Sequence, residues 1–258
     1  MVSATRGRRP ETSSDKTLSV MDLFTPDRPE WTVEAACLAL GQSESTVYRY
    51  FRSLTAAGLI FSIRPGRYLL GPGIVHYDRQ LRSSDPLLRA AEPTFAKLSH
   101  AYGVPSTVFI CRIYRDHVMA MHEHRSGAPP LPEGVFARGR LAPLFCGPPA
   151  LAMLAFMEVR AVRAMFQKSA GEDADWLEIK RRMRTIRAVG YAVSLDDPDP
   201  GVILLAAPLK QQDGGIAGGL CLGLAHTAEN ATLIAQAGED LVDEASKMAE
   251  RSLIFSNT

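Results

Sequence analysis

The sequence predicts an α+β protein with two parts: an N-terminal winged helix-turn-helix domain, and a C-terminal domain that combines an antiparallel sheet with helices. Two observations lead to this fold class. Residues 17–73 have the apolar spacing of three short helices followed by a β-hairpin, which is the element order of a winged helix-turn-helix. After residue 85, β-prone runs alternate with longer amphipathic helices, and Asp213-Gly214 is a strong hairpin signal between two of those runs.

The composition is that of a globular protein, with 258 residues, 46% hydrophobic and 22% charged. No apolar run approaches the roughly 20 residues of a membrane helix. The start of the chain lacks the apolar segment of a secretory signal, so we expect a cytoplasmic protein without a membrane partner. Cys37, Cys111, Cys146 and Cys221 are far apart and form no C-x-x-C pair, which argues against a zinc ribbon or a redox motif. The expected cytosolic setting argues against disulfides.

The charge is distributed slightly unevenly between the two parts. Residues 1–73 contain 9 Lys or Arg and 7 Asp or Glu, which gives +2, and the remainder contains 20 and 21, which gives −1. We expect residues 1–16 to be a basic, disordered tail. Such a tail is either simply solvated or also contacts phosphates, and the sequence favours neither.

The three N-terminal helices are separated by clear breaks. A short amphipathic helix is predicted over residues 16–24, and the two prolines of "TPDRPE" end it. The second helix has Thr32 as its candidate N-cap and ends at Gly41. The third helix begins after a two-residue turn, with Ser43 as its cap, and stops at Gly58. This short connection is typical of a helix-turn-helix.

The third helix, Ser43–Ala57, has two different sides. Val47, Phe51 and Leu54 recur at spacings of three and four and predict the packed side. Short polar and cationic residues occupy the other side, where they suit phosphates and base edges. Spacing alone leaves an ordinary surface helix equally open. The predicted DNA-binding residues, including two arginines at the wing tip, are Ser43, Ser45, Thr46, Tyr48, Arg49, Arg52, Arg64 and Arg67.

The remaining elements follow from the same signals. Arg64-Pro65-Gly66 fits a tight turn between two short strands, which predicts the wing. A linker helix is expected over residues 74–84, and a second domain over residues 85–258. Within that domain we expect helices at 86–103, 148–157, 158–167, 173–190 and 227–252, and strands at 106–114, 117–124, 191–195, 201–210 and 215–225.

Two stretches resemble one known family. "TVEAACLALGQSESTVYRYFRSLTAAGLI", followed by "GRYLLGPGIVHYDRQL", is similar to the DNA-binding domain of the IclR family of bacterial transcription regulators. The shared features are a Gly turn, a Ser-x-Ser-Thr-Val-x-Arg helix and a Gly-x-Tyr-x-Leu-Gly end to the wing. "RAVGYAVSLDDPDPGVILLAAPLKQQDGG" resembles the family's Gly-Tyr, acidic-loop, Gly-Val and Ala-Ala-Pro segment. The likeness covers about residues 17–255.

The resemblance implies a ligand-responsive regulator that binds double-stranded operator DNA. It also implies a linker helix used in dimerisation, a GAF-like effector-binding domain, and a homodimer or homotetramer that responds to a small molecule, often an organic acid. No cofactor is expected.

The effector pocket departs from the family pattern. The family's pocket loop is Pro-Leu-His-x-Thr-Ala-x-Gly-x-Ala, whereas this chain has "PLFCGPPALA". The polar positions that bind carboxylates in the family have largely lost their donors here, and an apolar lining suits a larger, more apolar ligand. We therefore expect an aromatic acid or a similar compound. The expected effector-binding residues are Phe145, Cys146, Gly147, Ser194, Leu204, Cys221 and Gly223.

Other patterns carry weaker signals. His122 and His124 are two apart on a predicted strand and could start a zinc site, but no third ligand is evident nearby, so no metal site is predicted. The cations of "KRRMRTIR" could extend a DNA footprint, although the solvent face of an amphipathic helix is favoured.

An enzyme is not expected, because no nucleophile elbow, H-E-x-x-H, kinase or dinucleotide motif occurs. Cys146 and His122 could form a nucleophile pair only if the fold brought them together. The alternative to a DNA-binding regulator is a small-molecule sensor or an enzyme built on the GAF-like domain alone.

Overall fold

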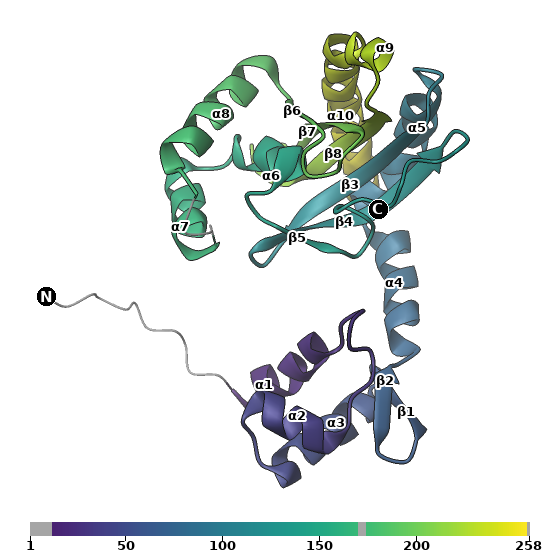
Figure 1. Cartoon of the computed structure of the whole chain (residues 1–258), viewed down its shortest axis with the longest axis vertical. Coiled ribbons are helices and arrows are strands. Elements are labelled where there is room, and N and C mark those ends of the chain that lie inside the picture. The colour runs from purple at the N-terminus through teal and green to yellow at the C-terminus, as the bar shows by residue number, and fades with distance from the viewer. Residues whose placement is uncertain (1–11, 170–173, 257–258) are drawn as a thin grey trace, which may run out of the picture. The chain divides into compact units, whose positions relative to one another are not determined.

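A computed structural model describes residues 12–169 and 174–256 of the chain. The chain divides into two compact units, one that ends at Ser83 and one that begins at Ser84 (Figure 1). Most of the expected tail lies outside the described residues. The first helix begins earlier than expected, at Ser13, because Thr12 and Asp15 form a capping box that satisfies the free backbone groups at its start.

The first unit contains four α-helices, one 3-10 helix and one hairpin within the described residues. Gly41 adopts a left-handed conformation, with φ of 62°, and ends the second helix as the sequence predicts. The elements are α1 (Ser13–Ser19), η1 (Val20–Leu23), α2 (Val33–Leu40), α3 (Glu44–Ala56), β1 (Ile60–Arg64), β2 (Arg67–Leu70) and α4 (Gly73–Ser84).

Trp31 connects the helices of this unit to the β1–β2 hairpin, which we call the wing. Its backbone pairs with Tyr68 in both directions, at 3.0 and 2.9 Å, which forms an isolated β-bridge to the hairpin. Its indole N–H donates to the carbonyl of Leu23 at 2.8 Å. The ring itself is buried with Val47 and Phe51 of α3. One residue thus holds the wing and the helices in a single core.

The second unit is built on a six-stranded antiparallel sheet in the order β5-β4-β3-β8-β7-β6. Its strands are β3 (Ser106–Tyr114), β4 (His117–Ser126), β5 (Leu141–Pro143), β6 (Ala192–Leu195), β7 (Val202–Lys210) and β8 (Ile216–Ala225). Its helices are α5 (Pro86–His100), α6 (Gly147–Leu154), α7 (Val159–Ser169), α8 (Trp176–Val189), α9 (Ala228–Ala231) and α10 (Ile234–Ser256).

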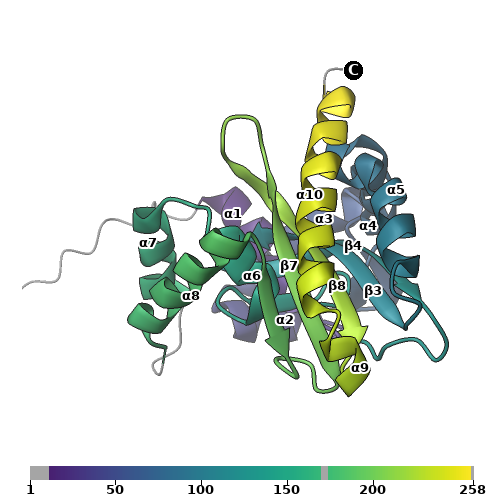
Figure 2. The ribbon, with the colours of Figure 1, turned by 90° about the horizontal axis from the view of Figure 1, so that it is seen from above.

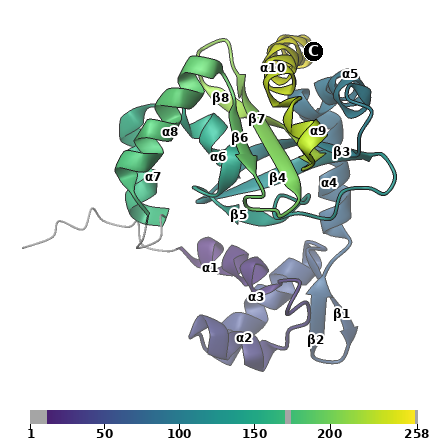
Figure 3. The same cartoon turned by 45° about the horizontal axis from the view of Figure 1, so that its top comes forward.

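The two faces of this sheet are covered by different helices. On one face α10 runs along β7 and β8, with α5 beside it (Figure 2). On the other face lies α6, and α8 packs on α6 (Figure 3). Because side chains alternate along a strand, Ile203 and Leu205 of β7 enter the core under α5 and α10, whereas Leu204 enters the core under α6.

Three details of this unit differ from the sequence expectations. The last helix is interrupted at residues 232–233, so that a short helix, α9, precedes α10. The short strand β5 was not expected, because three residues are too few to show a period. A β-bulge pairs Cys111 with Ala120 while its neighbour Ile110 pairs with His122. The bulge changes which residues of β4 face each side of the sheet.

Candidate functional site

The third helix, α3, separates its buried and exposed residues as its periodicity predicts. Val47, Tyr50, Phe51 and Leu54 are buried in the core of the first unit. The predicted DNA-contacting residues lie outside that core, and Tyr48 is 57% exposed. Within the set, Ser43, Ser45, Tyr48, Arg49 and Arg52 are exposed, and Thr46 is half-buried. The exposed side is therefore available to a partner along its whole length.

The start of α3 has polar groups suited to an anion. Ser43 occupies the N-cap position, but its hydroxyl does not cap the backbone. It donates instead to Oγ1 of Thr46 at 2.9 Å and lies 3.3 Å from Oγ of Ser45. The first N–H groups of α3 therefore have no acceptor from the N-cap side chain. Such groups, together with the helix dipole, favour a phosphate.

The arginines of this unit fall into two classes. Arg49 and Arg52, on α3, form no ion pair with any part of the chain that the structure describes. The wing arginines, by contrast, share one carboxylate: Arg67 donates a hydrogen bond to Glu30, and Arg64 Nη2 lies 3.5 Å from Oε2 of Glu30. The hydrogen bond from Arg67 lowers the pKa of Glu30. Glu30, which the sequence reasoning missed, offsets one of the two wing charges.

In the second unit, one row of directly paired residues crosses the sheet on the face covered by α6. It runs from Ser194 of β6 through Leu204, Gly223 and Thr107 to Arg125 of β4. Three members of this row are among the effector-binding residues expected from the sequence. Thr107 and Arg125 were missed, because only the strand pairing places Thr107 opposite Gly223 and Arg125 opposite Thr107.

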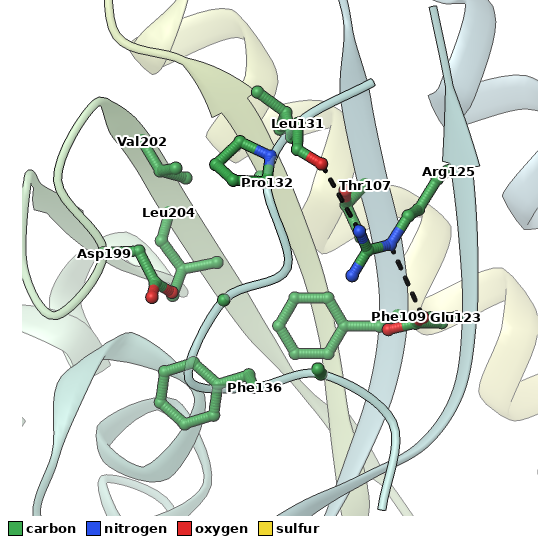
Figure 4. Close-up of a pocket in the computed structure, with 13 residues that line it drawn as sticks. Thr107, Phe109, Glu123, Arg125, Leu131, Pro132, Phe136, Asp199, Val202 and Leu204 are labelled. Carbon is green, nitrogen blue, oxygen red and sulfur yellow. Dashed lines mark hydrogen bonds and ion pairs between the residues drawn. The ribbon is translucent and has the colours of Figure 1, made fainter. Parts of the chain in front are cut away.

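A small cavity lies over the middle of this row (Figure 4). Its walls are the sheet, the loop between β4 and β5 (residues 127–140), and Asp199 from the loop between β6 and β7. The free volume is about 40 Å³, which is room for a few water molecules. The lining residues are Thr107, Phe109, Glu123, Arg125, Leu131, Pro132, Gly134, Phe136, Ala137, Asp199, Val202, Leu204 and Gly223.

The cavity is mainly apolar but has charged groups on two sides. The rings of Phe109 and Phe136 lie nearly parallel, with centroids 6.2 Å apart, and both are buried. Asp199 accepts a hydrogen bond from the backbone N–H of Val135 at 2.8 Å, which ties the 127–140 loop to the next loop. Arg125 and Glu123 stand on the opposite side, on β4 (Figure 4). The lining of this cavity is therefore largely apolar but includes one cation and two carboxylates.

The expected effector-binding residues are divided between the cavity and its surroundings. Leu204 and Gly223 line the cavity. Ser194 donates its hydroxyl to the carbonyl of Asp197 and is not among the lining residues. Cys221 faces the same side as Gly223 but is fully buried, with its sulfur 3.6 Å from that of Cys111. It belongs to the core beneath α6.

The start of α6 holds the other three expected residues. Phe145 packs edge-on against Phe166, with ring centroids 5.2 Å apart. Gly147 has φ of 69°, and a Cβ added there would lie 3.2 Å from the Phe136 ring. The "PLFCGPPALA" segment thus supports the wall of the cavity from behind, through Phe136, and none of its residues lines the cavity.

The structure does not bring Cys146 and His122 together. Cys146 begins α6 on one face of the sheet, and His122 stacks on Phe95 of α5 on the other, with ring centroids 5.2 Å apart. Burial, reinforced by Asp197 and Asp199, raises the pKa of Cys146, so its thiol stays protonated and is a poor nucleophile.

His122 and His124 do share one face of β4, but the described ranges contain no group of three residues arranged to hold a metal ion. None of the helices in these ranges is long and apolar enough to cross a membrane.

Comparison with known proteins identifies the first unit. Residues 13–60 match the model of the IclR helix-turn-helix domain. No curated protein matches the chain.

Solved structures match along almost the whole chain. A protein from Silicibacter sp. TM1040, described as an IclR transcriptional regulator, has a TM-score of 0.79 at 20% identity, over 93% of this chain and 96% of its own. An IclR transcriptional regulator from Alicyclobacillus acidocaldarius has a TM-score of 0.74 at 19% identity, over 95% and 100%. An IclR homologue from Microbacterium hydrocarbonoxydans, in complex with 4-hydroxybenzoate, has a TM-score of 0.73 at 15% identity, over 94% and 100%.

At such identities the structural matches establish the fold of the chain, and the domain match establishes the type of its first unit. Residues 13–60 are thus an IclR-type helix-turn-helix, a DNA-binding domain, and the chain as a whole has the fold of the IclR-family transcriptional regulators.

Proposed function

We propose that this protein is a ligand-responsive transcriptional regulator. In this proposal α3 lies in the major groove of operator DNA, and the second unit binds an aromatic or other largely apolar organic acid. The DNA part is supported by the exposed side of α3, where Arg49 and Arg52 form no ion pair with any described residue, within a matched IclR helix-turn-helix. An exposed arginine on this helix can donate two hydrogen bonds from its guanidinium to the edge of one guanine.

The proposed contacts have different roles. Arg49 would read a base, and the hydroxyls at the start of α3 would bind phosphate, where the free N–H groups and the helix dipole assist them. The wing arginines would contact the backbone or the minor groove. For these, a phosphate must compete with Glu30, so their contribution to binding depends on breaking an ion pair that already exists.

The ligand part of the proposal is supported by the cavity on the sheet. Phe109, Phe136, Leu131 and Leu204 supply the apolar walls that an aromatic ring requires. The Microbacterium homologue of the same fold was solved with 4-hydroxybenzoate, which is an aromatic acid. A ligand that changes DNA affinity must favour one arrangement of the DNA-binding units over another. We propose a homodimer or homotetramer, since a symmetric pair of helices would read two half-sites.

A direct experiment separates a regulator from a sensor or enzyme that does not bind DNA. Fluorescence anisotropy with labelled duplex DNA from upstream of the protein's own gene should give saturable binding that unlabelled random duplex does not abolish. The same titration is repeated with aromatic acids, and one of them should change the affinity. Equal affinity for the upstream and random duplexes would contradict the operator-binding proposal. Binding of an acid without any DNA binding would favour the sensor.

A further inference from the structure

We infer that Arg125 anchors the carboxylate of the effector, so that the cavity selects an anion over a neutral compound of the same shape. The inference rests on the proposed function, because it concerns the ligand of the second unit. It assigns a role to Arg125 and requires the ligand to carry a negative charge, which the apolar lining alone does not suggest.

Arg125 stands at the edge of the cavity, on β4. It pairs with Thr107 at the end of the row that crosses the sheet, which places its side chain on the face that bears the cavity. Its guanidinium points toward the space between the Phe109 ring and the 131–132 segment (Figure 4). The side chain is 26% exposed, so most of its length is withdrawn from solvent. A cation in this position needs an anion or several acceptors nearby.

The guanidinium of Arg125 has an incomplete set of hydrogen bonds among the described residues. Its Nε is buried and makes no hydrogen bond among the described residues. The oxygen Oε1 of Glu123 lies 3.5 Å from it, which is close enough for an ion pair but long for a hydrogen bond. Nη1 donates to the carbonyl of Leu131 at 3.3 Å, also a long contact. A guanidinium has five N–H donors in a planar fork, and a carboxylate matches that fork with two parallel hydrogen bonds.

The carboxylate of Glu123 also binds a second partner. Its second oxygen, Oε2, accepts the backbone N–H of Arg138 at 3.1 Å and so helps to hold the 127–140 loop. Asp199, across the cavity, is held by the N–H of Val135. Neither carboxylate is placed to form a fork with Arg125. A ligand carboxylate would therefore replace the Leu131 carbonyl at Nη1 and also accept from Nη2, with its apolar part against Phe109, while Nε stays beside Glu123.

This arrangement also couples ligand capture to the loop. The cavity of about 40 Å³ cannot admit an aromatic ring unless a wall moves. The Leu131 carbonyl belongs to that wall and is held by the same guanidinium that would bind the ligand. When the ligand carboxylate replaces the Leu131 carbonyl on the guanidinium, the loop would be released next to the cavity, where the aromatic ring needs space.

The test uses the full-length protein and two pairs of probes, benzoate with benzamide and phenylacetate with phenylacetamide. Isothermal titration calorimetry should show each acid binding to the wild type at least about tenfold more tightly than its amide. Arg125→Gln should abolish this preference while keeping the weaker binding of the amides. Arg140→Gln is the control, because Arg140 lies at the end of the 127–140 loop, is not among the lining residues, and binds Glu133 and the Gly134 carbonyl instead; it should leave the preference unchanged.

The outcomes that would contradict the inference are distinct from those that would contradict the proposed function. Acids that bind Arg125→Gln as tightly as the wild type, or amides that equal the acids in the wild type, would overturn the inference and leave the proposed sensing function standing. If neither acids nor amides bind the wild type, the proposed ligand class and the inference both fail. Should Arg125→Gln not fold, Arg125→Lys decides: it keeps the charge without the fork, so acid affinity should fall several-fold, and full affinity would contradict a bidentate anchor.

Discussion

The α3 helix and the cavity on the sheet are two sites of very different construction. The predicted contacts of α3 come from ten consecutive positions, 43–52, and a single helix presents all of them. The residues that line the cavity come from four strands and two loops, and span positions 107–223. The comparison teaches that a site made by one helix can be predicted from periodicity, whereas a site made across a sheet depends on how the strands pair.

The largest expected effect concerns the two sides of α3. Phe51→Ala should destabilise the first unit by about 3–5 kcal/mol, because Phe51 is almost fully buried among the helices and the wing. DNA binding should be lost with it. Tyr48→Ala is the control, since Tyr48 lies on the exposed side and its removal should change stability by no more than about 0.5 kcal/mol. Chemical denaturation followed by circular dichroism measures both, and equal destabilisation would contradict the assignment of the two sides.

The second prediction separates the core from the cavity on β8. Cys221→Trp should destabilise the second unit by about 1–3 kcal/mol or more, because Cys221 is fully enclosed beside Cys111. Gly223→Val should be tolerated, since an added Cβ meets its neighbours no closer than 3.6 Å, and its methyl groups would occupy the cavity. Thermal unfolding should therefore distinguish the two variants. Gly223→Val should lose binding of aromatic acids while keeping DNA binding; ligand binding retained at wild-type strength would move the site away from this cavity.

The third prediction concerns the base contact proposed for α3. Arg49→Ala should weaken operator binding by about 1–3 kcal/mol and reduce the discrimination between operator and random duplex. The reason is the loss of a bidentate contact to one base, without any change in the core. Competition binding with operator variants measures this discrimination. An operator affinity that does not change would remove Arg49 from the recognition set.

The smallest expected effect concerns the wing. Glu30→Gln should release Arg64 and Arg67 from their shared carboxylate, and so strengthen binding to DNA of any sequence and make its salt dependence steeper. Arg67→Ala should act in the opposite direction and reduce the slope of the salt dependence by about one. Titrations at several salt concentrations give both slopes. If Glu30→Gln leaves the slope unchanged, the wing arginines do not contact phosphates.

Much of the first unit could be predicted from the sequence because its signals are local. The spacing of Val47, Phe51 and Leu54 gives the buried side of α3, and Gly41 marks the end of α2. The ion pairs of Glu30 could not be predicted in this way. Glu30 is more than thirty positions from the wing arginines, and only the pairing of Trp31 with Tyr68 brings the two segments together.

The second unit was predicted well in its elements and less well in its site. Its strands and most of its helices follow from composition and period, and the expectation that Cys221 and Gly223 share a face is confirmed. The same reasoning could not tell that Cys221 is buried under α6 whereas Gly223 lines the cavity. Alternation gives the face of a strand on which a residue lies, but the packing of α6 decides which part of that face is covered. Nor could it find Arg125, since the bulge at Ile110 and Cys111 shifts the register of β4.

The sequence by itself determined the order of the elements, the two units and the buried side of α3, because each of these depends on neighbouring residues. Only the tertiary structure decided which residues meet: Glu30 with the wing, and Arg125 with Thr107, Gly223 and Leu204 around one cavity. The physical reason is that strand register and the packing of loops on a sheet arise from contacts between distant segments. No local pattern in the chain specifies such contacts.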